Sequence, residues 1–240
     1  MSELDDRRPL YKRLCDQIAE EIIRNRWGPG QQLPTEAEFI AKYNMSSGTV
    51  RKALDLLESN GVVERVQGSG TFVRRPDWSN VQTHAIRYFG SAGDPRTLRS
   101  RIVERKAVTG PHEVTTVLQL EPNAPVIRLL RLRSHDGLPA LTEEIWLDEE
   151  RFAPLLTTPD TEQPLLYPLY EQLCGVAVAR AKESITIETA DPLDAEMLGL
   201  VEGRPIVVIS RVAFGYDGRP VEWRRSRGPA SDFHFEVEIR

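Results

Sequence analysis

The chain has 240 residues, of which 40% are hydrophobic and 28% charged, and its formal net charge is -5. This length suffices for about two small domains, and the composition excludes a disordered, collagen-like or disulfide-scaffold chain. No apolar run approaches the ~18 residues that a membrane-spanning helix needs. The first eight residues are not followed by the apolar segment of a secretory signal. We therefore expect a cytoplasmic protein that is not an integral membrane protein.

The negative charge is distributed unevenly along the chain. Residues 1–75 hold 12 Lys and Arg against 11 Asp and Glu, whereas the remainder holds 19 against 25. The N-terminal part is therefore the part whose charge is compatible with binding a nucleic acid.

The N-terminal part predicts three helices and a hairpin. Apolar residues recur at helical spacing, a capping box precedes the second helix, and glycines separate two β-rich runs. The expected elements are a helix from Pro9 to about Trp27, a helix from 35 to about 43, a helix from near 46 to 60, and a hairpin of strands 62–66 and 71–73.

This order is the layout of a winged helix-turn-helix, in which the third helix enters the major groove. Hydroxyls and a guanidinium on its first turn would contact phosphates and a guanine edge, and the hairpin glycines would let the backbone approach phosphates. The alternative is a small helical domain whose basic residues are ordinary surface. The residues expected to contact DNA are Thr35, Ser46, Ser47, Thr49, Arg51, Lys52, Arg65, Gln67, Gly68 and Gly70.

A polar stretch at residues 74–80 predicts a linker, so the expected domains are residues 1–73 and 81–240. The second domain contains an internal repeat. A Leu-x-Leu, Pro and Arg pattern at 118–131 recurs 80 residues later, and an Asp-Gly-x-Pro turn at 136–139 recurs 81 residues later. Each half therefore predicts a helix, a strand, a turn and a strand.

The remaining segments complete an α+β domain with an antiparallel sheet. The expected elements are helical stretches near 149–156 and 164–174, a strand near 178–187 and a closing strand from Phe233 to Ile239.

Several motifs of the first domain resemble the DNA-binding domain of the GntR family of bacterial transcription regulators. They are Pro9-Leu10-Tyr11, Pro29-Gly30-x-x-Leu33-Pro34-Thr35-Glu36, Thr49-Val50-Arg51-x-Ala53-Leu54-x-x-Leu57, Gly61 and Gln67-Gly68-x-Gly70-Thr71-Phe72-Val73. Members of this family typically read bases with three arginines, whose positions here hold Ala37, Ser47 and Arg51. Each lost bidentate contact would remove ~1 to 3 kcal/mol of base discrimination, which implies a changed or looser half-site.

The second domain, over residues 98–239, resembles the UTRA effector domain of the HutC branch of that family, whose fold is similar to that of chorismate lyase. The resemblance is carried by Arg131-Leu132-Arg133, Asp136-Gly137-x-Pro139, Glu143, Leu166-Tyr167, Arg180-Ala181-x-Glu183, Ala195-x-x-Leu198-Gly199-Leu200 and Asp217-Gly218-Arg219-Pro220-Val221-Glu222. It implies a homodimer and a site for a small anionic metabolite. In that site Arg131 and Arg133 would clamp the anion, Glu143 and Glu222 would accept ligand protons, and Tyr167 would form a wall.

Arginines at i and i+2 on a strand share a face, which agrees with a shared cleft. The alternative is that Arg131 and Arg133 pair with acids on a solvated sheet. The resemblance also has departures, since Leu165 and Gly228 stand where sugar-phosphate binders place a hydroxyl and an aromatic residue, and residues 87–97 match the usual serine-rich loop poorly. These departures favour a small carboxylate over a sugar phosphate.

The sequence thus predicts a ligand-responsive transcription regulator, a repressor that a small metabolite releases from a palindromic DNA operator. The alternative is an enzyme of chorismate-lyase-like fold acting on a small carboxylate. No nucleophile elbow, Walker loop or complete zinc-protease motif supports an enzyme. We therefore expect no catalytic residue, no metal and no cofactor.

Overall fold

The computed structural model describes residues 8–24, 27–74, 98–158 and 165–234. The chain forms two compact units. The first runs to Pro76, with the strand ends Ala177–Arg180 and Phe214–Arg219 grouped with it, and the second holds the rest. The predicted linker at 74–80 and the predicted start at residue 81 lie, apart from Arg74, outside the described residues.

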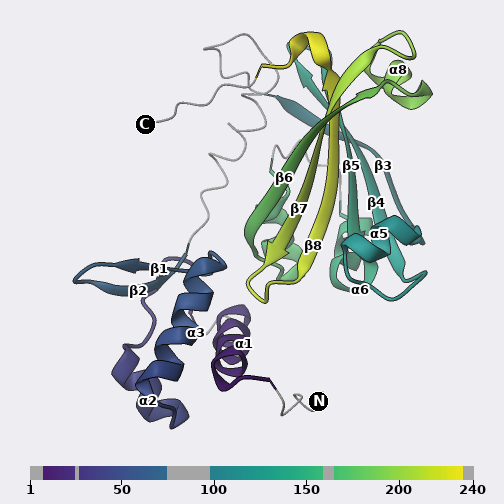
Figure 1. The fold of residues 1–240 in the computed structure, drawn as a ribbon. Coiled ribbons are helices and arrows are strands. Elements are labelled where there is room, and N and C mark those ends of the chain that lie inside the picture. The colour runs from purple at the N-terminus through teal and green to yellow at the C-terminus, as the bar shows by residue number, and fades with distance from the viewer. Residues whose placement is uncertain (1–7, 25–26, 75–97, 159–164, 235–240) are drawn as a thin grey trace. The chain divides into compact units, whose positions relative to one another are not determined.

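The first unit is built from three helices and a hairpin, as the sequence predicts (Figure 1). Its elements are α1 (Leu10–Ile23), α2 (Glu36–Tyr43), α3 (Ser47–Ser59), β1 (Val63–Val66) and β2 (Gly70–Val73). The strands pair antiparallel, with Val63 opposite Val73. The apolar faces of the helices meet in one core, whose fully buried members include Leu14, Ile18, Phe39, Val50 and Ala53.

The first helix is shorter than predicted. It ends at Ile23 rather than near Trp27. The Trp27 ring packs edge-on against Phe39, with 6.1 Å between the ring centroids, and the chain leaves the helix before it reaches this position. Leu10 begins the helix and is 54% exposed.

Side-chain caps fix the starts of the next two helices. The backbone N–H of Thr35 donates to the Glu38 carboxylate at 2.8 Å, and the N–H of Glu38 donates to the Thr35 hydroxyl at 3.3 Å. This is the predicted capping box, and it satisfies two donors that the helix cannot satisfy itself. The Ser46 hydroxyl likewise accepts from the N–H of Thr49 at the start of α3.

The second unit is a six-stranded antiparallel sheet in the order β3-β4-β5-β8-β7-β6. Its strands are β3 (Arg99–Thr109), β4 (Pro125–His135), β5 (Leu138–Asp148), β6 (Val178–Thr189), β7 (Pro205–Gly215) and β8 (Pro220–Pro229). Its helices are α5 (His112–Val117), α6 (Glu149–Phe152), η1 (Ala153–Leu156), α7 (Tyr167–Cys174), α8 (Pro192–Leu198) and η2 (Ala230–Asp232). The predicted closing strand falls mostly at residues 235–240, outside the described part.

The internal repeat of the sequence corresponds to two halves of the sheet. One half is β3-α5-β4-β5 and the other is β6-α8-β7-β8, and they occupy mirrored places in the strand order. The halves meet where β5 pairs with β8, and there Glu144 lies opposite Arg225. These two residues are themselves 81 positions apart, which is the offset between the two Asp-Gly turns. The sheet therefore has an approximate twofold relation between its halves.

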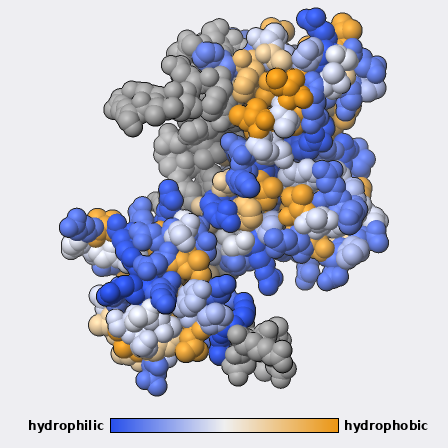
Figure 2. All heavy atoms as spheres, viewed as in Figure 1, coloured by the Kyte–Doolittle hydropathy of each residue, from blue (hydrophilic) through white to orange (hydrophobic). Residues whose placement is uncertain are grey.

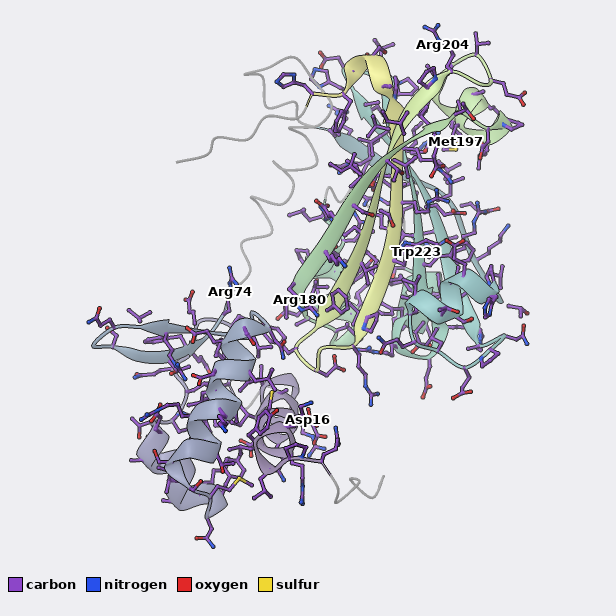
Figure 3. The ribbon with its side chains drawn as sticks, in the orientation of Figure 1. Asp16, Arg74, Arg180, Met197, Arg204 and Trp223 are labelled. Atoms are coloured by element: carbon purple, nitrogen blue, oxygen red, sulfur yellow. The ribbon has the colours of Figure 1, made fainter. Side chains whose placement is uncertain are left out.

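The two faces of the sheet carry different kinds of side chains. On one face, α5 covers an apolar cluster that includes Val114, Trp146 and Trp223, and Figure 3 labels Trp223 on β8 within the sheet. On the other face, Arg131 pairs in register with Glu143, and Ile145 pairs with Arg224. Because directly paired residues point to the same face of a sheet, this second face carries a group of charged side chains.

Candidate functional sites

The first turn of α3 presents polar side chains. The Ser46 and Thr49 hydroxyls lie 2.9 Å apart, and Ser47 and Lys52 are exposed. Arg51 is 63% exposed and donates to the Glu36 carboxylate at 3.2 Å. This side chain could therefore reach the major groove of DNA, but it must break its ion pair with Glu36 to contact a base.

Arg65, predicted to contact DNA from the hairpin, is held by acids of α3. Its guanidinium lies 2.6 Å from the Asp55 carboxylate and 3.4 Å from that of Glu58. Arg65 therefore forms an ion pair within the unit, and a phosphate contact would have to compete with two carboxylates.

The hairpin turn is fixed by a residue that the sequence analysis did not single out. The Gln32 side-chain amide donates to the carbonyl of Ser69 at 2.8 Å, and Gln32 pairs with Phe72 as an isolated bridge. Gly70 has a φ of +125°, and a Cβ there would lie 2.5 Å from Gln32 Nε2. The positive φ therefore favours glycine at position 70, and a Cβ there would displace the Gln32 amide from the Ser69 carbonyl, while Gln67 and Gly68 stay exposed.

A buried charged cluster occupies the second face of the sheet. Arg131 and Arg133 are 1% and 3% exposed, and Glu143 between them is 1% exposed. The Glu143 carboxylate lies 2.9 Å from Arg131 Nη1 and 3.6 Å from Arg133 Nη1. The two arginines do pair with an acid, as the alternative interpretation expected, but they do so in the interior and not on a solvated sheet.

Glu222, fully buried on β8, is surrounded by donors. The hydroxyls of Tyr167 and Tyr170 donate to its two oxygens at 3.1 and 2.7 Å. Nε and Nη2 of Arg224 donate to the same two oxygens at 3.0 and 2.8 Å. Both carboxylate oxygens are thus engaged by the protein, although the sequence predicted that Glu222 accepts protons from a ligand.

Three members of this cluster were missed from the sequence, namely Tyr170, Arg211 and Arg224, whereas Glu183 was named for the resemblance without a role in the site. Arg224 Nη1 lies 3.4 Å from the Glu143 carboxylate and joins the two acids. Arg211 donates from Nε to Glu183 at 2.6 Å. The internal repeat holds a signal for two of them, because Arg211 is the repeat counterpart of Arg131 and Arg224 that of Glu143.

Burial and neighbouring charges shift the pKa values in the cluster. Burial alone would raise the pKa of Glu143, but the arginines around it, Arg131 and Arg224 foremost, lower that pKa to about 2. Burial lowers the pKa of the Arg133 guanidinium to about 10, and burial raises the pKa of the Tyr167 hydroxyl to about 12. Glu143 and Arg133 are therefore both charged at neutral pH.

The cluster has an excess of positive charge. Arg131, Arg133, Arg211 and Arg224 stand against the carboxylates of Glu143, Glu183 and Glu222. In addition, Nε and Nη2 of Arg133 are buried and have no hydrogen-bond partner among the described residues. A buried guanidinium with unpaired donors is costly unless an anion completes it. The arrangement is suited to holding an anionic group.

Two family models match the chain. The model for bacterial regulatory proteins of the gntR family covers residues 10–73, and the model for the UTRA domain covers residues 94–234. No helix in the described ranges is long and apolar enough to cross a membrane.

Curated relatives match over most of their length. A "Probable fructoselysine utilization operon transcriptional repressor" of Shigella flexneri is 28% identical and aligned over 88% of this chain and 87% of its own. The "Mannosyl-D-glycerate transport/metabolism system repressor MngR" of Escherichia coli is 27% identical over 96% and 95%. The crystal structure of PhnF from Mycobacterium smegmatis matches with 25% identity and a TM-score of 0.56, over 97% of this chain and 99% of that one.

A winged helix-turn-helix unit is followed in the chain by a sheet domain that contains a buried cluster of arginines and glutamates. This combination defines a two-domain, DNA-binding transcription regulator. The chain belongs to the GntR family, and its second domain is a UTRA domain of the HutC type. Both resemblances found in the sequence are confirmed. The enzyme alternative is wrong, because the family consists of regulators.

Proposed function

We propose that the protein is a homodimeric repressor whose operator complex is released by a small metabolite that carries one carboxylate. The domains of this proposal are residues 1–73, which bind DNA, a linker at 74–80, and residues 81–240, which bind the effector and form the dimer. The protein would act in the cytoplasm, where the DNA is.

The observation that carries the effector class is the state of Arg133. Its Nε and Nη2 are buried without a hydrogen-bond partner among the described residues. These two donors form the fork that a carboxylate accepts in a bidentate pair. One carboxylate would satisfy both donors and neutralise the single excess charge, whereas a phosphate dianion would leave the cluster with a net negative charge.

The names of the relatives support this class. Fructoselysine and mannosyl-D-glycerate, which appear in the names of two relatives, are both compounds with a carboxylate. In this proposal Arg131 and Arg133 hold the carboxylate, and Glu143 lies between them. Tyr167 lines the site, and Glu222 positions Arg224 and the tyrosines.

On DNA, the third helices of two copies would occupy the two half-sites of a near-palindrome. Arg51 would read a guanine, while the hydroxyls of α3 and the hairpin backbone would contact phosphates. Effector binding would change the spacing or freedom of the two DNA-binding units through the linker, which is thermodynamic coupling between two sites.

The test is binding of the purified full chain to fluorescent DNA that flanks its own gene, at fixed salt concentration, with and without a panel of hydroxy acids, amino-acid conjugates of sugars and sugar phosphates. The proposal expects sequence-specific binding that one carboxylate compound releases. It also expects operator DNA to weaken effector binding by the same factor. Release by sugar phosphates alone would contradict the effector class, and binding without sequence preference would contradict the repressor.

A further inference from the structure

The hairpin of the first unit packs into the core only at its base. Val63 and Val73, which face each other in the strand pair, are 2% and 0% exposed, whereas Glu64, Arg65 and Val66 are exposed. Figure 1 shows the hairpin extending to one side of α3. An isolated two-stranded hairpin is at best marginally stable in water. Contacts outside the core must therefore hold the part of the hairpin beyond its base.

The segment before α2 holds the hairpin along β2. The backbone N–H of Val73 donates to the carbonyl of Gln31 at 2.8 Å, and the N–H of Leu33 donates to the carbonyl of Thr71 at 2.7 Å. This segment thus pairs with β2 like a short third strand. β1 pairs only with β2 in the sheet that the structure describes, so its outer edge lacks such a backbone partner there.

A side chain links β1 to α3 instead. Nη1 of Arg65 lies 2.6 Å from Oδ1 of Asp55 and 3.4 Å from Oε2 of Glu58. Asp55 and Glu58 are three residues apart on α3 and therefore lie on one side of the helix. Figure 2 shows that hydrophilic residues prevail on the visible surface where α3 meets the hairpin. One guanidinium thus connects the exposed part of the hairpin to two positions on the helix.

The same ion pairs make Arg65 a poor partner for a DNA phosphate. Its single positive charge stands between two carboxylates, so it is already more than neutralised where it lies. Contact with a phosphate would take the guanidinium away from both carboxylates and leave them close to the negatively charged DNA backbone, which repels them. Lys52 of α3 has no such cost, because it is exposed and forms no ion pair within the described part of the chain.

We propose that Arg65 is a positioning residue of the DNA-binding unit. Its ion pairs with Asp55 and Glu58 fix the orientation of the hairpin relative to α3, so that the hairpin backbone meets the phosphates when α3 lies in the major groove. This role takes the place of the phosphate contact that the sequence alone predicts for Arg65. The inference deepens the proposed function and rests on the part of it in which the first unit binds DNA, but not on the effector class.

The first test is the salt dependence of operator binding by the full chain. Arg65→Met should raise the operator dissociation constant by about three- to tenfold at every salt concentration. The slope of log affinity against log salt should stay at the wild-type value, because a backbone N–H that contacts a phosphate releases no counterion. Lys52→Ala is the comparison, and it should lower the slope by about 1. A similar fall of the slope in Arg65→Met overturns the proposal.

A double-mutant cycle tests whether Arg65 acts through the two acids. In the Asp55→Asn/Glu58→Gln background the ion pairs are already lost, so adding Arg65→Met should leave operator affinity unchanged. A direct phosphate contact would instead lose affinity in both backgrounds. An equal loss with and without the acids therefore contradicts the positioning role.

A third measurement follows the hairpin without DNA. Hydrogen–deuterium exchange of the full chain, read by mass spectrometry, should be faster over residues 63–73 in Arg65→Met than in wild type. Arg24→Met is the matched control, because Arg24 also pairs with an acid, Glu20 at 3.6 Å, but lies at the end of α1 outside the hairpin. Its exchange over residues 63–73 should equal that of wild type. Unchanged exchange in Arg65→Met overturns the proposal.

The outcomes separate this inference from the proposed function. If the wild-type chain releases operator DNA with a carboxylate while Arg65→Met exchanges like wild type, the positioning role is contradicted and the proposed function is intact. If the wild-type chain binds DNA without sequence preference, the proposed function is contradicted, whereas faster hairpin exchange in Arg65→Met would still support the link from Arg65 to α3.

Discussion

Glu222 and Arg224 are two residues apart on β8 and form a two-point ion pair in the interior, with Nε and Nη2 at 3.0 and 2.8 Å from the two carboxylate oxygens. Their side chains are 0% and 9% exposed. Removing one partner from such a pair leaves an uncompensated buried charge.

Glu222→Gln is therefore expected to destabilise the fold by about 3 to 5 kcal/mol, because Arg224 loses its nearest counter-charge. Urea unfolding followed by circular dichroism measures this difference. Glu188→Gln is the matched control, since the Glu188–Arg225 pair is partly exposed and is worth less than about 1 kcal/mol. Equal effects of the two substitutions would contradict the burial argument.

We expect Arg133→Met to impair the response to the effector without destabilising the fold. The substitution removes a buried guanidinium two of whose donors have no partner among the described residues, and it leaves Glu143 in contact with Arg131 and Arg224, so stability should change little. Response to the carboxylate effector should be lost, while DNA affinity in the absence of effector stays at the wild-type value. Calorimetry and fluorescence anisotropy on one preparation give the three results. Strong destabilisation of this variant would show that Arg133 is needed for folding, which would contradict a role in effector binding alone.

Stability should fall at acid pH through Glu143. Its folded pKa of about 2 lies below the ordinary value of 4.5, so its stabilising contribution is fully present above pH 4.5 and is lost as pH falls towards 2. Urea unfolding from neutral pH down to about pH 3 should show wild-type stability decreasing within this window. Glu143→Gln, if folded, should be less stable at neutral pH, and its difference from wild type should shrink through the same window. A constant difference would contradict the pKa assignment.

Arg51→Ala is expected to weaken specific operator binding by about 1 to 3 kcal/mol and to relax the preference at one base pair. Binding to random DNA should change much less. Lys52→Ala provides the comparison, because a lysine that contacts phosphate weakens binding to all sequences alike and lowers the salt slope by about 1. Fluorescence anisotropy titrations at several salt concentrations measure the DNA affinities of both variants. If Arg51→Ala lost the same affinity for operator as for random DNA, Arg51 would have no role in base recognition.

Local signals in the sequence were sufficient for most of the fold. The capping box at Thr35 and Glu38, the serine before α3 and the glycine turn of the hairpin act within a few residues, so a pattern read along the chain predicts them correctly. The internal repeat predicted the helix, strand, turn and strand of each half for the same reason, but the strand β3 that precedes them in the first half was not predicted. The first helix was predicted too long: it ends at Ile23, and Trp27, beyond its end, packs against Phe39 in the tertiary structure.

The sequence by itself determined the family, the two-domain organisation and the arginine pair of β4. The tertiary structure alone decided the composition of the cluster. The pairing of β5 with β8 brings Glu143 close to Arg224. The packing of α7 against the sheet lets the hydroxyls of Tyr167 and Tyr170 donate to Glu222. Spacing along the chain carries no information on which distant strands become neighbours. Burial is likewise a property of the packed sheet and not of the residue, and it is burial that makes the two Arg133 donors without a partner in the described part of the chain significant.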